Sequence, residues 1–539
     1  MANSDFDCAK RWPRIAQPPR IEASHGRILS SPLLWLILCA LASLYLSFFR
    51  LPFTPIWVGY DQMGFLWDAT RMWSGDRIYR DFFELTPPGI ELVDILFFRL
   101  FGLRNWIPNV HVILLGVSLT WLVVIISRKV IHGAPLRSLL PGFLFLAVAF
   151  FPTMIESHRW FSSAALLAAL AVVMEERTPR RLIVAGALFG VASLFTQTQG
   201  VFAFIGLATF LLWEWRKRNS EWRELLGKMA YLLASFVVTV LATNAYFVWK
   251  AGLHRFLDCL VRYPLLYYPA DRVHNSWQVY LTEMPQFPPW IHLPRLAGFF
   301  FIHAILPLVY IVFLFRYRRG ATNEEEGVRL VLLNVMGLFL FASVAPSPSY
   351  LRLCAVSAPA LITLVYWIRG KERLQRISAG LLWMAVLCLG TVHPLQVQMS
   401  AVSVLQLPRG PMAFLKQSSV AHDLLRWLAS QTRPGDFFFA PGEPGIFYPL
   451  ALRPVGEAPG YDDTDYTRPE QVQSAIVALK KYHPRLIQWP PDSTDPKFYR
   501  PEGDHLGPLR EYVQTNYRLL KRFDSPASDE WEEVWGRKE

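Results

Sequence analysis

Long apolar segments recur in this chain from residue 32 to residue 393, with short polar or basic segments between them. Several approach the roughly 20 residues that an α-helix needs to cross the hydrocarbon core of a bilayer. The chain has 539 residues, 53% of them hydrophobic, so its apolar content far exceeds what one soluble core requires. The pattern therefore predicts a polytopic α-helical membrane protein.

Lysine and arginine gather in the segments between the apolar runs, as in the cytoplasmic loops of membrane proteins. If each basic cluster is cytoplasmic, two spans must separate neighbouring clusters. The sequence provides such spans at 32–49, 107–127, 138–153, 160–175, 181–196, 199–214, 229–249, 294–315, 329–345, 350–368 and 377–393. We therefore predict eleven spans in a cell inner (plasma) membrane, with the tail 1–31 cytoplasmic and the C-terminus external.

The apolar stretch 87–102 would disturb this count if it also crossed the membrane. It contains Glu91, Asp94 and Arg99, which are costly inside a bilayer. We interpret it as a helix on the outer membrane surface. Residues 62–74 show a similar pattern, with apolar residues at helical spacing and Asp68 and Arg71 on the other side. Together they place two interfacial helices in an external loop, 50–106.

The composition changes at residue 396, where apolarity falls and proline and charge increase. Helical patterns at 421–431, 468–484 and 506–523 alternate with short strand patterns at 435–443 and 485–489. This alternation is typical of a small α/β domain. We predict a transmembrane domain, 32–395, followed by an external, periplasmic α/β domain, 396–539.

The net charge of +12 would suggest nucleic-acid binding in a soluble protein. Here the basic residues lie in short loops, and the chain has no basic, aromatic-interleaved soluble domain, so nucleic acid is excluded as a partner. The five cysteines form no CxxC pair, which argues against a disulfide framework or a cysteine metal site.

The first external loop is rich in acids and aromatic residues. Asp61 opens its first helix, and Glu84 precedes the double proline of "YRDFFELTPPG". Asp61 could cap the helix, or it could take a proton from a substrate hydroxyl. Glu84 could belong to a solvated turn in an aromatic interface belt, or to a site. These alternatives remain open from the residues alone.

Two later external turns carry further charged residues at the membrane boundary. "MIESHRW" contains Glu156, His158 and Arg159, and "SPSYLRL" contains Arg352. The basic residues could extend toward the interface or contact a phosphate, for which the planar guanidinium is well suited. Glu156 and His158 could also take part in a divalent metal site, although no cofactor is required by the pattern. The long loop 250–293 adds Arg262.

This order of motifs resembles the GT-C class of membrane glycosyltransferases over roughly residues 30–400. A first span leads to "GYDQ", then to "GDRIYRDFF" and a double proline with glycine; a second acid and a polar turn follow. Within this class, the chain is similar to the branch that contains lipid A aminoarabinose transferase and protein O-mannosyltransferase-like bacterial enzymes. Those enzymes take a sugar from a polyprenyl phosphate on the external membrane face.

The resemblance implies roles for particular residues. Asp61 matches the usual catalytic carboxylate, Glu84 a polar position near the donor, Glu156 the acid of the second external loop, and Arg352 a late basic residue. Thr86 stands where many relatives have Lys or His, and Thr196 and Gln197 stand where many have Lys. The phosphate contact is therefore expected among Arg80, Arg159, His158, Arg262 and Arg352.

The expected function is transfer of a sugar from a polyprenyl-phosphate donor to a lipid, glycan or protein acceptor of the cell envelope, with Asp61 as general base. Membrane lipids surround the protein in this interpretation. The alternatives are a transporter or flippase, and a polysaccharide polymerase. A carrier usually keeps ionisable residues near the middle of the membrane, whereas the predicted spans contain few.

The topology can be tested by labelling single cysteines introduced at residues 104 and 132 in a variant without the native cysteines. We expect a membrane-impermeant thiol reagent to modify residue 104 from the external side and residue 132 only from the cytoplasmic side. Labelling of residue 104 from the cytoplasmic side alone would show that 87–102 crosses the membrane.

Overall fold

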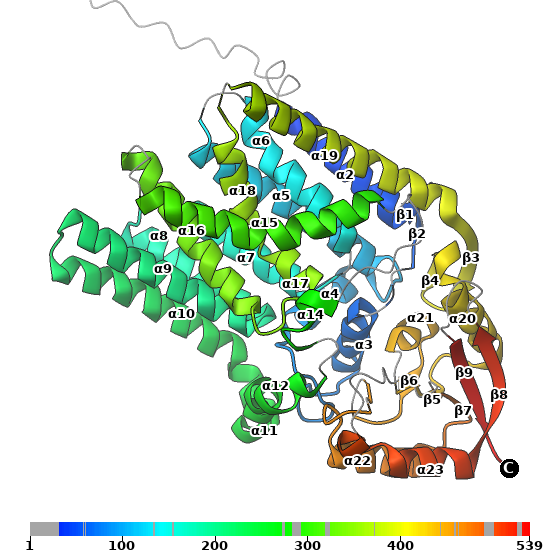
Figure 1. Cartoon of the computed structure of the whole chain (residues 1–539). Helices are drawn as coiled ribbons and strands as arrows, with labels where there is room; N and C mark the ends of the chain where they lie inside the picture. The colour runs from blue at the N-terminus through cyan, green and yellow to red at the C-terminus, as the bar shows by residue number, and fades with distance from the viewer. Residues whose placement is uncertain are drawn as a thin grey trace, which may run out of the picture.

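A bundle of long helices forms most of the molecule, and a mixed α/β region covers one of its ends (Figure 1). This computed structural model describes residues 32–57, 59, 61–132, 135–153, 156–271, 275–282, 293–318, 324–370, 372–441, 444–457, 460–461, 463–489, 501–524 and 531–539. The predicted tail 1–31 lies outside these residues, as does the side chain of Asp61.

Helical segments cover all the ranges that the sequence predicts as spans. They are α2 (Pro32–Phe48), α5 (Ile107–Val130), α6 (Pro135–Leu144) continued by η1 (Phe145–Phe150) and η2 (Phe151–Thr153), α7 (His158–Val173), α8 (Pro179–Phe195), α9 (Gln197–Arg218), α10 (Trp222–Ala251), α15 (Leu293–Arg318), α16 (Glu324–Val344), α17 (Tyr350–Ala355), α18 (Ala358–Trp367) and α19 (Arg373–Ser400).

Six of the described segments are long and apolar enough to cross a membrane: Ile107–Val130, Leu136–Thr153, Trp222–Ala251, Leu296–Tyr317, Gly327–Val344 and Arg373–Ser400. Three shorter helices are also apolar: Leu33–Phe48, His158–Val173 and Ala358–Trp367. The expectation of a multi-pass membrane protein is confirmed. The count of eleven crossings stays a prediction.

Close backbone approach holds neighbouring helices of the bundle together. Gly186 of α8 faces α10, where an added Cβ would overlap Ser235 and the carbonyl of Leu232. Small residues at such contacts allow the dispersion contacts that drive helix association where the hydrophobic effect is weak.

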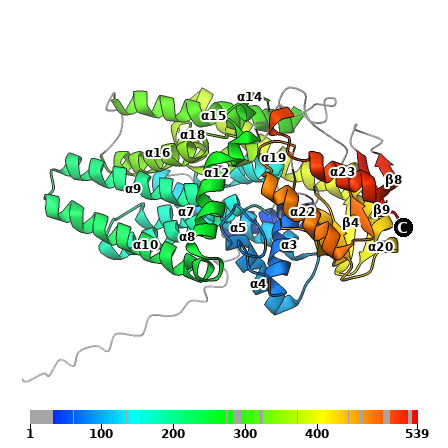
Figure 2. The same cartoon turned by 90° about the horizontal axis from the view of Figure 1, so that it is seen from below.

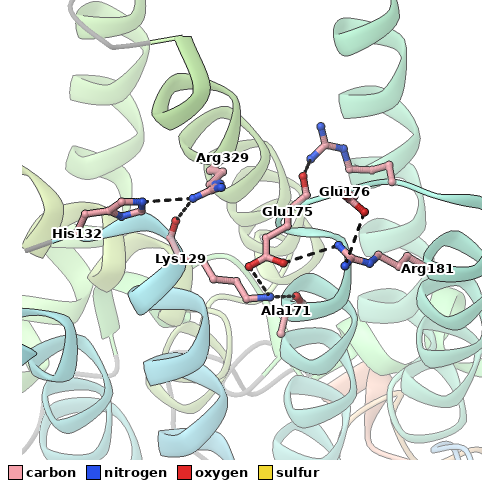
Figure 3. Close-up of polar contacts among 8 residues, drawn as sticks. Lys129, His132, Ala171, Glu175, Glu176, Arg181 and Arg329 are labelled. Carbon is pink, nitrogen blue, oxygen red and sulfur yellow. Dashed lines mark hydrogen bonds and ion pairs between the residues drawn. The ribbon is translucent and has the colours of Figure 1, made fainter. Parts of the chain in front are cut away.

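The basic clusters meet at one end of the bundle, as Figure 3 shows for the ends of α5, α7, α8 and α16. The Lys129 ammonium lies 3.6 Å from Glu175, and Arg329 donates to the Lys129 carbonyl at 2.8 Å. Arg177 forms a buried ion pair with Glu214. The basic residues that the charge pattern assigns to the cytoplasm therefore lie together at one end of the bundle. Which side of the membrane this end faces stays a prediction.

The predicted external loop lies at the opposite end. After the short strands β1 (Phe49–Arg50) and β2 (Thr54–Pro55) it contains α3 (Asp61–Trp73) and α4 (Gly89–Phe101), which confirms both predicted helices. A second insertion follows α10 and contains α11 (Leu253–Leu257), η3 (Asp258–Arg262), α12 (Tyr263–Leu266), η4 (Tyr268–Ala270) and α14 (Val279–Thr282).

The C-terminal region has a hairpin and a mixed five-stranded sheet in the order β6-β5-β7-β9-β8. Its elements are β3 (Ala401–Leu407), β4 (Gly410–Leu415), η6 (Lys416–Ser418), α20 (Ser419–Gln431), β5 (Phe437–Phe439), η7 (Pro444–Ile446), α21 (Phe447–Leu450), β6 (Arg453–Pro454), α22 (Pro469–Tyr482), β7 (Leu486–Gln488), η8 (Pro501–Gly503), α23 (Gly507–Asn516), β8 (Tyr517–Asp524) and β9 (Trp531–Arg537).

The prediction of one helix over 506–523 is wrong in its second half. The helix α23 ends at Asn516, and residues 517–524 form β8, which pairs antiparallel with β9. Leucines at helical spacing continue through this segment, but pairing with a partner strand outweighs that local preference. The hairpin β3–β4 and strand β9 were also not predicted.

The helix α3 lies between the bundle and the C-terminal region in both views (Figures 1 and 2). Met63 and Leu66 are fully buried in a core shared with residues of β3, β4 and α21. The Trp67 ring stacks on Phe447 with centroids 4.7 Å apart. The C-terminal region therefore fixes the position of α3 against the end of the bundle.

Candidate functional site at the end of the helical bundle

The turn before α4 is organised by Glu84. Its Oε1 accepts hydrogen bonds from the backbone N–H groups of Leu85 and Thr86, both at 2.8 Å, and from the Thr86 hydroxyl at 2.9 Å. Pro87 and Pro88 follow and lead into the helix. Burial raises the pKa of Glu84, while the hydrogen bonds from Thr86 act in the opposite direction. Glu84 therefore has a clear structural role in shaping this turn.

Five carboxyl groups are buried around this turn and the adjoining helices. They belong to Asp68, Glu84, Glu91, Asp94 and Glu156. Burial is the largest cause that raises the pKa of each, and for most of them neighbouring carboxyls raise it further. Burying an ionised carboxylate without a partner costs free energy, so these groups need bound protons or nearby cations.

The polar side of α3 is buried within the protein. Asp68 shares a hydrogen bond with Glu84. Arg71 is buried too, with its Nε 3.1 Å from Asp76 and its guanidinium 4.3 Å from the centre of the Phe82 ring. The segment that follows α3, which carries Asp76, Phe82 and Glu84, covers this face.

The acidic residues of α4 likewise point into the protein, whereas its Arg99 is exposed. Glu91 and Asp94 are both 0% exposed, whereas the apolar residues Leu96 and Leu100 are exposed. The sequence prediction that 87–102 is helical holds, but its two acidic side chains are enclosed by protein. The exposed apolar face is suited to contact with lipid.

His111 of α5 brings two of these carboxyls together. Its Nδ1 lies 2.5 Å from Glu156 Oε1 and 3.3 Å from Asp94 Oδ1. The possible ligand atoms of the three side chains all lie within 4.8 Å of one another. Chemically, this set could share protons or hold a cation.

Gln62 connects this group to the start of α3. Its Oε1 accepts a hydrogen bond of 3.0 Å from the backbone N–H of Glu156. Asp61 is the preceding residue and opens α3, so the backbone of the predicted catalytic residue lies beside the segment that carries Glu156.

His158 has partners within the bundle. Its Nδ1 lies 2.8 Å from the Thr196 hydroxyl and 3.1 Å from the Phe195 carbonyl, so it joins α7 to the turn before α9. The neighbouring Arg159 donates its backbone N–H to the Ser157 hydroxyl. Both residues lie at the end of the bundle that holds the carboxyl groups.

Arg352 is partly buried at the start of α17. Its Nη2 donates to the Tyr268 hydroxyl at 2.6 Å and to the Asn275 side-chain oxygen at 2.9 Å, while Nη1 donates to the Ser347 carbonyl. Arg352 thus holds the insertion after α10 against the bundle. These hydrogen-bond partners are all neutral, so none of them offsets the positive charge of the guanidinium.

Arg80 and Arg262 face solvent, with side chains 53% and 58% exposed. Arg80 lies 3.6 Å from Asp81, and Arg262 lies 3.6 Å from Asp258 one helical turn earlier. Within the described part of the chain, no hydrogen bond or ion pair joins either residue to Asp68, Glu84, Glu91, Asp94 or Glu156. Arg468 of the C-terminal region, which sequence analysis did not select, is bound to Asp258 at 3.1 Å.

Comparison with solved structures identifies this architecture. ArnT from Cupriavidus metallidurans bound to undecaprenyl phosphate matches with a TM-score of 0.58 and 13% identity, over 94% of this chain and 98% of that chain. The same protein in the apo state matches with a TM-score of 0.56 and 14% identity, over 95% and 98%. The chain has an ArnT-like GT-C fold.

A family model agrees with this fold. The model described as dolichyl-phosphate-mannose-protein mannosyltransferase matches residues 86–247, which run from the turn before α4 into α10. A comparison with curated protein sequences gave no match. The resemblance to GT-C membrane glycosyltransferases inferred from the sequence is confirmed.

Several buried polar residues of the bundle and the first external loop are not among the candidates that the sequence offers. In the sequence, Glu91 and Asp94 are charges unfit for a membrane span, and His111 lies within a predicted span. Gln199 is fully buried, and both polar atoms of its side chain have no hydrogen-bond partner among the described residues. A polar residue inside an apolar run was the available signal in each case.

The buried carboxyl of Asp68 makes a testable prediction about pH and stability. Because burial raises its pKa in the folded state, the folded protein holds this proton more tightly than the unfolded chain. Stability should therefore fall as pH rises above the ordinary value near 4, by at most about 1.4 kcal/mol per pH unit for one group. Asp68→Asn removes this pH-dependent loss of stability, because the amide does not ionise.

We measure the melting temperatures of Asp68→Asn and the wild type in detergent at pH 5 and at pH 8. The melting temperature of the variant minus that of the wild type should be larger at pH 8 than at pH 5. Asp524→Asn serves as the control, because its side chain is 64% exposed. An equal difference between Asp68→Asn and wild type at both pH values would show that ionisation of Asp68 does not weaken the fold.

Proposed function

We propose that this GT-C protein is a glycosyltransferase that moves a sugar from a polyprenyl-phosphate donor to a lipid, glycan or protein acceptor of the cell envelope. The observation that carries the proposal is the match over almost the whole chain to ArnT bound to undecaprenyl phosphate, together with a buried carboxyl cluster at one end of the bundle. A lipid-linked donor keeps its tail in the bilayer, so its sugar phosphate must react at such an end.

In this proposal, Asp61 is the general base. It removes the proton from the acceptor hydroxyl as that oxygen attacks the anomeric carbon of the donor. The bond between the anomeric carbon and the phosphate oxygen breaks, and polyprenyl phosphate leaves with the electron pair. Basic groups then stabilise the departing phosphate, which needs little protonation. The hydrogen bond that the Glu156 backbone N–H donates to the Gln62 side-chain oxygen supports this placement of α3.

The distribution of ionisable groups favours a transferase over a carrier. The carboxyl cluster lies at the end of the bundle that carries α3, α4 and the turn before α7, whereas carriers bind near the midplane. The C-terminal region packs directly on α3, which also suits an enzyme that must enclose a reactive lipid head group. A transporter, flippase or polymerase would be the remaining alternatives if no sugar transfer occurred.

The catalytic assignment can be tested with Asp61→Asn, since Asn caps a helix about as well as Asp but is not a base. We expect turnover to fall by roughly 10²–10⁴-fold while the protein stays folded, the usual scale for general acid–base catalysis. Glu84→Gln should lose less, because the amide oxygen can still accept hydrogen bonds in its turn. Glu156→Gln provides a second comparison.

Sugar transfer by well-folded Asp61→Asn protein at more than about a tenth of the wild-type rate would remove Asp61 from the role of base. A similar loss in Glu84→Gln would instead indicate that the turn before α4 must be intact for activity.

The phosphate role of Arg352 can be tested by measuring binding of a polyprenyl-phosphate sugar to Arg352→Ala. Hydrogen bonds to charged groups contribute about 1.5–3 kcal/mol, so affinity should fall roughly 10- to 150-fold. Arg369→Ala, at the opposite end of the bundle, should bind normally.

Tyr268→Phe separates phosphate binding from loop positioning, because it removes only the hydroxyl that Arg352 contacts. We expect it to bind the donor almost as well as the wild type. A loss as large as that of Arg352→Ala would assign Arg352 to holding the insertion. Unchanged binding in Arg352→Ala would place the phosphate contact elsewhere.

A further inference from the structure

We propose that Asp94, His111 and Glu156 bind a divalent transition-metal ion, Zn²⁺ or Mn²⁺, which joins α4 and the turn before α7 to α5. This metal binding does not depend on the proposed glycosyl transfer. The three side chains come from three separate segments, so one ion would fix their relative positions at the end of the bundle.

The geometry already approaches that of a metal site. Nδ1 of His111 lies 2.5 Å from Glu156 Oε1 and 3.3 Å from Asp94 Oδ1. All three ligand atoms lie within 4.8 Å of one another. Ligands bound to one zinc ion at about 2.0–2.2 Å lie about 3–4 Å apart, so small side-chain adjustments would complete the coordination.

The hydrogen bonding of the group is incomplete without a cation. Both carboxylate oxygens of Asp94 and the second oxygen of Glu156 are buried and have no hydrogen-bond partner in the described structure. Asp94 and Glu156 are each 0% exposed. Buried polar atoms are normally satisfied, and an ion is one explanation for a group that is not.

The local charge balance also favours a cation. Glu91, whose two oxygens are likewise buried and unpartnered in the described structure, interacts electrostatically with both Asp94 and Glu156. His111 is the basic group that contacts Asp94 and Glu156. Three carboxyls near one imidazole require added protons or a metal ion to avoid a large buried negative charge.

The donor set selects the type of metal. Imidazole suits Zn²⁺ and other transition metals, whereas a purely carboxylate site would suit Mg²⁺ or Ca²⁺. One histidine with two carboxylates therefore favours Zn²⁺ or Mn²⁺. The rings of Phe97 and Phe161 pack edge-on near the His111 ring, at centroid distances of 4.2 and 6.3 Å, and restrict its rotation.

The test measures metal directly in the full-length protein, purified in detergent with an affinity tag that contains no histidine. After equilibration with Zn²⁺ or Mn²⁺ and removal of free ions, elemental analysis should find about one ion per chain. Asp94→Asn and His111→Gln should each weaken binding at least tenfold, since even outer partners of a metal site contribute 10–100-fold. Chelation should lower the melting temperature of the wild type but not of His111→Gln.

Two matched variants control for burial. His303→Gln alters another buried histidine, whose Nδ1 lies 3.0 Å from the Phe299 carbonyl. Asp258→Asn alters another buried carboxylate, which is paired with Arg468. Both variants should keep the ion. Because metal content and melting temperature are read without any sugar donor, failure of the proposed glycosyl transfer would leave this result unaffected.

Absence of bound metal in the wild type after equilibration with both ions would overturn the proposal and assign shared protons to the cluster. Equal metal content in the ligand variants and the two controls would also overturn it, because the ion would then lie elsewhere. If Asp94→Asn fails to fold, His111→Gln provides the comparison, and Asp94→Glu, which keeps a carboxylate, should retain binding.

Discussion

Enclosure of acidic groups at one end of a membrane-embedded bundle is the constraint on which the rest of this structure depends. Asp94 and Glu156 cannot be left ionised and unpartnered where protein and lipid exclude water. His111 reaches them from α5, Gln62 connects them to α3, and the C-terminal region presses α3 into place. Removing any of these contacts would expose a buried carboxyl to solvent or leave it without a partner.

The same constraint separates the two ends of the molecule. At one end, Arg329 and Lys129 lie in an open network of basic and acidic side chains (Figure 3). At the other end, carboxyls are buried, and Arg352 is held by the neutral side chains of Tyr268 and Asn275. A reaction that releases a lipid phosphate fits this second end, because fixed positive charge there can stabilise the leaving group.

Much of the helical bundle could be predicted from the sequence because apolar length and basic loops are strong local signals. The two helices of the first external loop were also predictable, since Met63 and Leu66 recur at helical spacing. The burial of Asp68 and Asp94 could not be predicted, because it depends on segments distant in the chain. The strand at 517–524 depends in the same way on pairing with β9.

The central claim is best tested by mass spectrometry of envelope lipids, glycans and proteins from cells that have the intact protein, lack it, or carry Asp61→Asn. The account predicts that one sugar modification is present with the intact protein and lost in the other two strains. Asp61→Asn protein must accumulate in the membrane at the wild-type level for this comparison. Identical modification of all three classes in the three strains would contradict a role in sugar transfer.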